Sequence, residues 1–148
     1  MGAKASVLNA SDERNNIYLY FILSNRFELN ARSEQLQIKK WKSLYLESKF
    51  KYTAKQNRAP AKMAIDEIIL AEQNGKTLPP FDFAKAPYGY FLWNINMGIS
   101  HPIHKSKIDF KVSVSNLLNI SNGEYTNRMR YYADDIGQNI SLAVKYSF

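Results

Sequence analysis

Residues 138–148, QNISLAVKYSF, close the chain with an unbroken alternation of apolar side chains with polar or small ones. A period of two indicates a β-strand with one apolar face and one polar face. The strand ends on an aromatic residue. This is typical of transmembrane β-barrels, in which successive residues face lipid and lumen in turn and aromatic side chains lie at the membrane boundary. The apolar set comprises Ile140, Leu142, Val144, Tyr146 and Phe148.

Four earlier segments alternate in a similar way, so the sequence predicts an all-β fold of about five antiparallel transmembrane β-barrel strands. These segments are residues 16–31, 43–57, 89–100 and 107–116. The composition is 45% apolar, with ten Tyr, eight Phe and two Trp, yet the mean hydropathy is negative. Barrel strands produce this combination because half of each strand is polar. The sequence contains no apolar run of about eighteen residues, which excludes a transmembrane helix.

The polar parity of the predicted strands is expected to face water inside a barrel. Lys49, Lys51 and Lys55 share one parity of their segment, and a lysine that faces lipid near the bilayer centre costs about 2–4 kcal/mol. The opposite, apolar parity is therefore expected to face lipid. The predicted lumen-facing residues are Lys49, Lys51, Asn94, Asn96, Asp109, Lys111, Asn139 and Lys145.

The connections between the predicted strands alternate in length. Residues 57–87 and 119–137 form long loops, whereas residues 32–42 and 101–106 form shorter connections. This pattern is typical of barrels with long external loops and short periplasmic turns. The first long loop is expected to contain a short helix that Pro60 opens and Gly75 closes, with its apolar residues packed on the barrel rim. Residues 1–15 are expected to form an irregular approach segment.

The sequence does not indicate a metal or cofactor site. Cysteine is absent, and His101 and His104 are interpreted as turn residues because a third ligand is missing. Glu124, Asp134 and Asp135 lack the spacing of a calcium-binding loop and are interpreted as solvated. No local signature of a nucleophilic site is present, so we do not expect an enzyme.

The net charge of +7 does not come from a compact basic cluster. The longest cluster is Lys39 and Lys40, and the other basic residues are scattered, which argues against nucleic acid as a partner. The second long loop holds the candidate ligand-binding residues, because Arg and Tyr suit an anionic aromatic ligand such as a metal chelate. The alternative is that this loop packs on its neighbours. The four candidates are Arg128, Arg130, Tyr131 and Tyr132.

Residues 112–148, VSVSNLLNISNGEYTNRMRYYADDIGQNISLAVKYSF, resemble the C-terminal end of TonB-dependent outer-membrane receptors. In that family an Asn-Leu-Phe-Asn-like turn precedes a Tyr-rich loop and the last strand. Here residues 116–119 form the turn, Leu118 stands where Phe is usual, and Gln138 stands where Arg often follows the glycine. Residues 54–60 and 81–92 are similar to segments of the Bacteroidetes branch of the family.

The resemblance implies a 22-stranded barrel with an N-terminal plug, of which residues 16–148 would be a C-terminal portion. It implies a bacterial outer-membrane location, although the chain carries no signal peptide. A complete receptor takes up a scarce nutrient such as a ferric chelate (a siderophore), whereas this chain by itself would transport nothing. Implied partners are outer-membrane lipid, lipopolysaccharide, TonB through the missing plug, and the barrel assembly machinery. That machinery would recognise the last strand through Ile140, Leu142, Val144, Tyr146 and Phe148.

A second hypothesis is a small soluble or self-contained β-barrel or sandwich that binds a ligand. Five strands are fewer than the eight of small membrane barrels. Such a module would therefore need a helix or a second chain to cover its apolar face and its two open edges.

Overall fold

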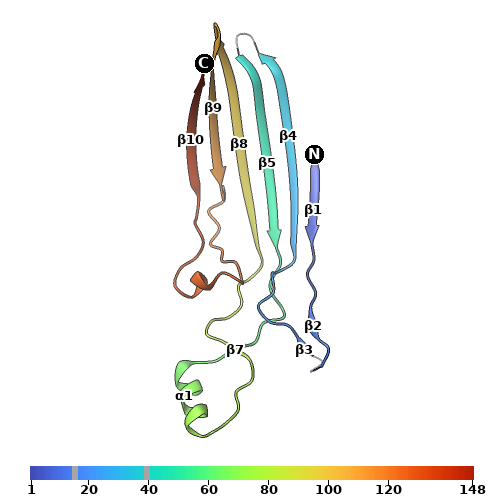
Figure 1. Ribbon diagram of the computed structural model, residues 1–148, viewed down its shortest axis with the longest axis vertical. Coiled ribbons are helices and arrows are strands. Elements are labelled where there is room, and N and C mark those ends of the chain that lie inside the picture. The colour runs from blue at the N-terminus through green and yellow to red at the C-terminus, as the bar shows by residue number, and fades with distance from the viewer. Residues whose placement is uncertain (15–16, 39–40) are drawn as a thin grey trace.

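The computed structural model describes residues 1–14, 17–38 and 41–148, and its main feature is a six-stranded antiparallel sheet. The strand order is β1-β4-β5-β8-β9-β10, and Figure 1 shows the strands side by side in one tall, curved layer. Within the described residues β1 and β10 are edge strands that do not pair with each other, so no closed barrel forms. The strands are β1 (Gly2–Ser6), β4 (Arg26–Ile38), β5 (Trp41–Thr53), β8 (Tyr90–Ile103), β9 (Ser106–Ser115) and β10 (Asn139–Ser147).

The smaller elements lie in the longer connections. A two-stranded sheet joins β2 (Ser11–Asp12) to β3 (Ile17–Tyr18), and another joins β6 (Ala61–Lys62) to β7 (Phe81–Asp82). The first long loop also holds helix α1 (Ile65–Gln73), and the second holds the 3-10 helix η1 (Arg128–Tyr131). Figure 1 shows the long loops at one end of the sheet, with the C-terminus and the short turn between β8 and β9 at the other.

The strand register separates an apolar face from a polar face across the sheet. One row of directly opposed residues on the apolar face is Leu46, Met97, Val112 and Leu142. The adjacent row, on the polar face, is Glu47, Asn96, Ser113 and Ser141. Because side chains alternate along each strand, every second row repeats this division. The period of two in the sequence therefore becomes two continuous surfaces.

A β-bulge places Trp41 on the apolar face. The β5–β8 register shifts between Lys42 and Tyr45, and Ser43 adopts a positive φ of 53°. One extra residue reverses the parity of the residues before it. The Trp41 ring consequently lies 4.7 Å from the His101 ring and 6.3 Å from that of Phe110. The bulge thus adds an aromatic side chain to the turn end of this face.

The sheet has no conventional core. Among the described residues only Tyr90 and Tyr125 are buried hydrophobic side chains. On β10 the side chains of Ile140, Leu142 and Val144 are 59–71% exposed. A soluble domain of this size normally buries about two thirds of the surface that its unfolded chain exposes. The apolar face therefore needs another environment or partner to cover it.

The five predicted strands are confirmed as β4, β5, β8, β9 and β10, but several boundaries are wrong. The first of them begins at Arg26, and the predicted connection from residue 32 is strand as far as Ile38, because it forms a ladder with β5. Asn16, Lys39 and Lys40, to which these expectations also refer, lie outside the described residues. Polar residues 32–35 carry no apolar alternation, so only the pairing partner identifies this part as a strand.

Further boundaries differ from the sequence prediction. Strand β5 begins at Trp41 rather than at residue 43 and ends at Thr53 rather than at residue 57. His101 is a strand residue and not a turn residue, since β8 continues to Ile103 and a two-residue turn follows, with His104 at φ 53°. The segment 1–15 is not irregular throughout, because Gly2–Ser6 forms β1 along the edge of β4. The clue in the sequence is weak, since the apolar side of β1 consists of two alanines opposite Leu29 and Phe27.

The predicted short helix is confirmed as α1, with different details. It begins after Ala64 rather than at Pro60, and the Glu67 carboxylate accepts a hydrogen bond of 2.9 Å from the Ala64 backbone N–H. Gly75 follows its end with φ +64°, as expected for a helix terminus. The expected packing on the sheet rim is wrong, because none of the helix residues is buried. No helix within the described ranges has the length and apolarity needed to cross a membrane.

Candidate functional site

Two long loops meet in a compact polar cluster at the loop end of the sheet. Arg130 of η1 donates from Nη2 to Asp82 Oδ2 at 2.5 Å, and the Tyr131 hydroxyl donates to Asp82 Oδ1 at 2.6 Å. The side chains of Arg130 and Asp82 are 5% and 0% exposed. A buried carboxylate needs a cation and hydrogen-bond donors to offset its lost hydration. This cluster therefore joins residues that are 48 positions apart in the sequence.

Aromatic rings surround the Arg130 guanidinium. Its central carbon lies 5.0 Å from the centre of the Tyr125 ring and 4.5 Å from that of Tyr131. Arg130 Nε also donates to the Tyr125 backbone carbonyl at 2.9 Å. Cation–π contacts become stronger when water is excluded. Arg130 is therefore held in one position by its charge partner, its hydrogen bonds and its flanking rings.

The cluster lowers the pKa of Asp82. Desolvation would raise that pKa, but hydrogen bonds from Tyr131, Arg130 and the Ala84 N–H, together with the Arg130 charge, outweigh it. The pKa of Tyr131 is raised, first by desolvation and then by its hydrogen bond to Asp82. At neutral pH the carboxylate is therefore charged and the phenol is protonated.

The lowered pKa of Asp82 predicts that acid loosens the contact between the loops. A carboxyl group whose pKa is lower when folded stabilises the fold above its unfolded value of 3.8, and this contribution disappears as pH falls through the folded pKa. The protection of residues 119–138 against hydrogen exchange, relative to the intrinsic rate at each pH, should fall below about pH 4. In Asp82→Asn the exchange should be faster at neutral pH and should show no added step in acid. An identical acid step in Asp82→Asn would contradict this assignment.

Asparagine residues fold the loop that carries η1. Asn116 and Asn119 have positive φ values of 50° and 51°, a conformation that asparagine tolerates better than most residues. The Asn116 amide donates to the Ile120 carbonyl at 2.8 Å and accepts from the Ile120 N–H at 2.9 Å. Arg26 of β4 then forms an ion pair with Glu124 at 2.7 Å. The Asn116 hydrogen bonds thus shape the start of the loop, and the Arg26–Glu124 ion pair attaches the loop to β4.

The four predicted ligand residues occupy two different environments. Arg130 and Tyr131 are engaged by Asp82, whereas Tyr132 is 85% exposed and Arg128 is exposed at the side of a hollow. This hollow has a volume of about 570 Å³. It is lined by Phe21, Phe83, Tyr125, Thr126, Arg128, Arg130 and Tyr131.

Sequence reasoning did not identify Phe21, Asp82, Phe83 and Tyr125 as parts of this cluster. The resemblance covers Asp82, Phe83 and Tyr125 but gives none of them a role, and their segments meet only in the folded chain. The nearest signal is the aromatic pair that flanks Asp82, Phe81 and Phe83, whose ring centres are 5.6 Å apart. Aromatic neighbours of a carboxylate are common, so this pair does not by itself indicate a site.

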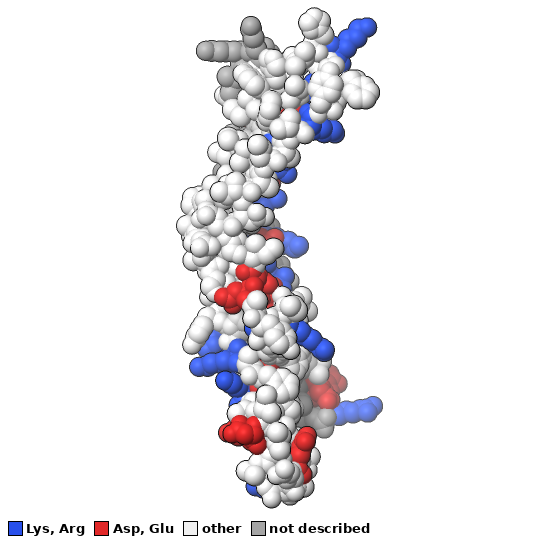
Figure 2. All heavy atoms as spheres, turned by 90° about the vertical axis from the view of Figure 1, so that its left-hand side faces the viewer, with Lys and Arg blue, Asp and Glu red and all other residues white. Residues whose placement is uncertain are grey.

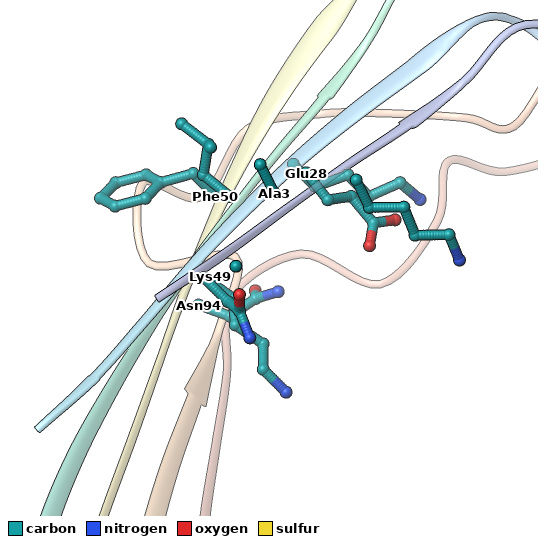
Figure 3. A pocket seen from close by; sticks show the side chains of 10 residues that line it. Ala3, Glu28, Lys49, Phe50 and Asn94 are labelled. Atoms are coloured by element: carbon teal, nitrogen blue, oxygen red, sulfur yellow. The ribbon is translucent and has the colours of Figure 1, made fainter. Parts of the chain in front are cut away.

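The strand register places all eight residues that are predicted to face a lumen on the same face of the sheet. For example, Lys49 lies directly opposite Asn94, and Lys111 lies directly opposite Gly98 of the same face. Figure 3 shows Phe50 extending from the strands on one side, and Lys49 and Asn94 on the other. A pocket of about 380 Å³ lies at the β1 edge of the sheet. Figure 2, a view onto the β10 edge, shows Lys and Arg projecting from one side of the upper sheet, whereas the described residues on the opposite side show no charge in this view.

The described residues contain no group of three or more His, Cys, Asp or Glu side chains arranged to hold a metal ion. His101 and His104 lie on the sheet and in the turn, and Glu124 pairs with Arg26. Asp134 accepts from Ser121, and Asp135 Oδ1 accepts from the Asn127 side chain at 3.0 Å. The acidic residues of the second long loop therefore stabilise its conformation.

We compared the chain with protein-family models, with curated proteins and with solved structures, and none of the three comparisons found a match.

Proposed function

We propose that this chain is the C-terminal barrel segment of an outer-membrane TonB-dependent receptor for a scarce nutrient such as a ferric chelate. The observation that carries the proposal is the exposed apolar face of the sheet, which is aliphatic in its middle and aromatic at both ends. On β8 this face carries Phe91 and Trp93 near the loops and Ile95, Met97 and Ile99 in the middle. Membrane barrels show this order because aromatic side chains favour the boundary between lipid and water.

The length of the apolar face supports a membrane span. From Phe91 to His101, which lies beside Trp41 at the turn end, β8 rises by about 33 Å at about 3.3 Å per residue. With a strand tilt of about 40°, this length corresponds to roughly 25 Å along the membrane normal, which is the height of the apolar band of membrane barrels. Tyr146 at the end of β10 adds another aromatic residue at the turn end.

The open edges support a segment of a larger barrel. β1 and β10 each pair on one side only within the described residues. Backbone N–H and C=O groups at an open edge cannot be left without partners in lipid, so neighbouring strands would have to supply them. On this proposal the polar face lines the lumen, the long loops lie outside, and the turn end lies in the periplasm. Transport would require the plug and the remaining strands.

The soluble alternative is less consistent with the burial of the chain. A self-contained module must bury its apolar residues, whereas Leu46, Met97 and Leu142 are 46–71% exposed in the middle of the sheet. Helix α1 does not cover them, since it lies in the loop at the far end of the molecule (Figure 1). The alternative therefore requires a partner chain over the whole face, and the membrane proposal does not.

A flotation experiment tests the proposal. We expect the full chain, diluted from denaturant into phospholipid vesicles, to float with the vesicles and to develop a β-type circular dichroism spectrum, with copies of the chain pairing at their open edges. Without vesicles or detergent it should aggregate, because the apolar face then has no cover. A folded, monodisperse monomer in buffer that does not float with vesicles would refute the membrane assignment and support the soluble module.

A further inference from the structure

The hollow beside η1 has the features of a small-molecule site, and it shares only part of its lining with the cluster around Asp82. Its volume of about 570 Å³ is within the usual range for ligand pockets, roughly 300–1,000 Å³. Most of its lining is aromatic. Phe21 and Tyr125 are stacked with ring centres 5.8 Å apart, and Phe83 meets the edge of Tyr131 at 6.2 Å.

The charge at the hollow is positive. Arg130 is neutralised by Asp82, but Arg128 forms no ion pair with any described residue and is exposed. Of the described residues, no Asp or Glu lines the hollow. A guanidinium that lacks a protein partner can bind a carboxylate through two parallel hydrogen bonds. Arg128 therefore supplies an anion-binding group next to flat apolar surfaces.

Tyr125 forms the buried part of the aromatic lining. This residue is 3% exposed, and its hydroxyl has no hydrogen-bond partner of ordinary geometry among the described residues, although it lies close to the Phe21 backbone. The hydroxyl oxygen itself is buried, so it is out of reach of a molecule in the hollow. Its neighbour Phe21 adopts a positive φ of 60°, a strained conformation for a bulky residue that fixes the ring against Tyr125.

We infer that this hollow binds a small molecule that carries both an aromatic ring and a carboxylate. The ring would lie against the aromatic lining, and the carboxylate would bind Arg128. The inference deepens the proposed function by naming the class of ligand, and it rests on that proposal for the external position of the loops. Binding itself depends only on the loop cluster.

Salicylate is a suitable probe, because it combines a ring, a carboxylate and a hydroxyl and can be followed by its own fluorescence. The full chain in detergent micelles should bind it saturably, and Arg128→Gln should weaken binding by about tenfold or more. The neutral analogue salicylamide and the non-aromatic cyclohexanecarboxylate should both bind more weakly than salicylate.

Arg32→Gln is the control, because Arg32 is an exposed arginine like Arg128 but lies on β4, outside the hollow. It should leave salicylate binding unchanged, and Arg128→Lys should restore part of the affinity lost in Arg128→Gln. Equal affinities of the original chain and Arg128→Gln, or equal binding of salicylate and salicylamide, would overturn the inference. A chain that floats with vesicles but does not bind salicylate refutes this inference only. A soluble chain that binds salicylate refutes only the membrane proposal.

Discussion

Replacing Met97 with lysine should reduce the partition constant of the chain into vesicles by roughly thirty-fold or more. Met97 lies in the middle of the apolar face, opposite Leu46 on one side and Val112 on the other. A lysine that faces lipid at the bilayer midplane costs about 2–4 kcal/mol. Every 1.4 kcal/mol is about a tenfold change in an equilibrium constant, which sets the expected reduction. Flotation at several lipid concentrations measures the partition constant directly.

The neighbouring substitution Asn96→Lys provides the control. Asn96 precedes Met97 on β8 but lies on the polar face, where its side chain donates to Glu47 at 3.1 Å. The new lysine would face water next to a carboxylate, so partitioning should change by less than about threefold. If both lysines reduced flotation equally, the effect would reflect added charge in general and not the face. Equal flotation of Met97→Lys and the original chain would contradict the assignment of this face to lipid.

Replacing Asp82 with alanine should release the second long loop from the first. The change leaves the Arg130 guanidinium, which is 5% exposed, without its carboxylate. Removing one partner of a buried ion pair costs about 3–5 kcal/mol, because the remaining charge is neither hydrated nor paired. Hydrogen exchange of the η1 amides should therefore accelerate by roughly two orders of magnitude or more. Amides of β8 and β9 should change little, since neither strand contributes a side chain to the cluster.

Two further variants test whether the faster exchange in Asp82→Ala comes from the unpaired charge of Arg130. Glu34→Ala removes the carboxylate of an exposed pair, Arg32 with Glu34, whose side chains are 49% and 41% exposed, and should cost less than about 1 kcal/mol. The double variant Asp82→Leu with Arg130→Met removes both buried charges and should recover much of the lost protection. If the double variant were as unprotected as Asp82→Ala, the loss would come from packing and not from the unpaired charge.

The part of the fold that could be predicted from the sequence is the part that repeats locally. Along β9 and β10 the period of two identified the strands and their faces, and the register then aligned Val112 with Leu142 on the apolar side. Trp41 does not follow the parity of the rest of β5, because the bulge at Ser43 reverses the parity of the residues before it. Such a bulge cannot be read from the pattern of hydrophobic residues. Gly2–Ser6 was missed because its side chains are small and only its position beside β4 makes it a strand.

The candidate site likewise has a part that can be read from the local sequence and a part that depends on distant segments. The sequence by itself determined that Arg128, Arg130, Tyr131 and Tyr132 are neighbours in one polar loop. Only the tertiary structure decided which of them remain available, because Asp82 reaches Arg130 and Tyr131 from a segment 48 and 49 positions away. Contacts over such distances depend on how the loops fold back beside the sheet, and no local periodicity records them. Alternation along a strand is a local property, so it can be read from the sequence. The pairing of a buried charge depends on distant segments, so it cannot be read from the sequence.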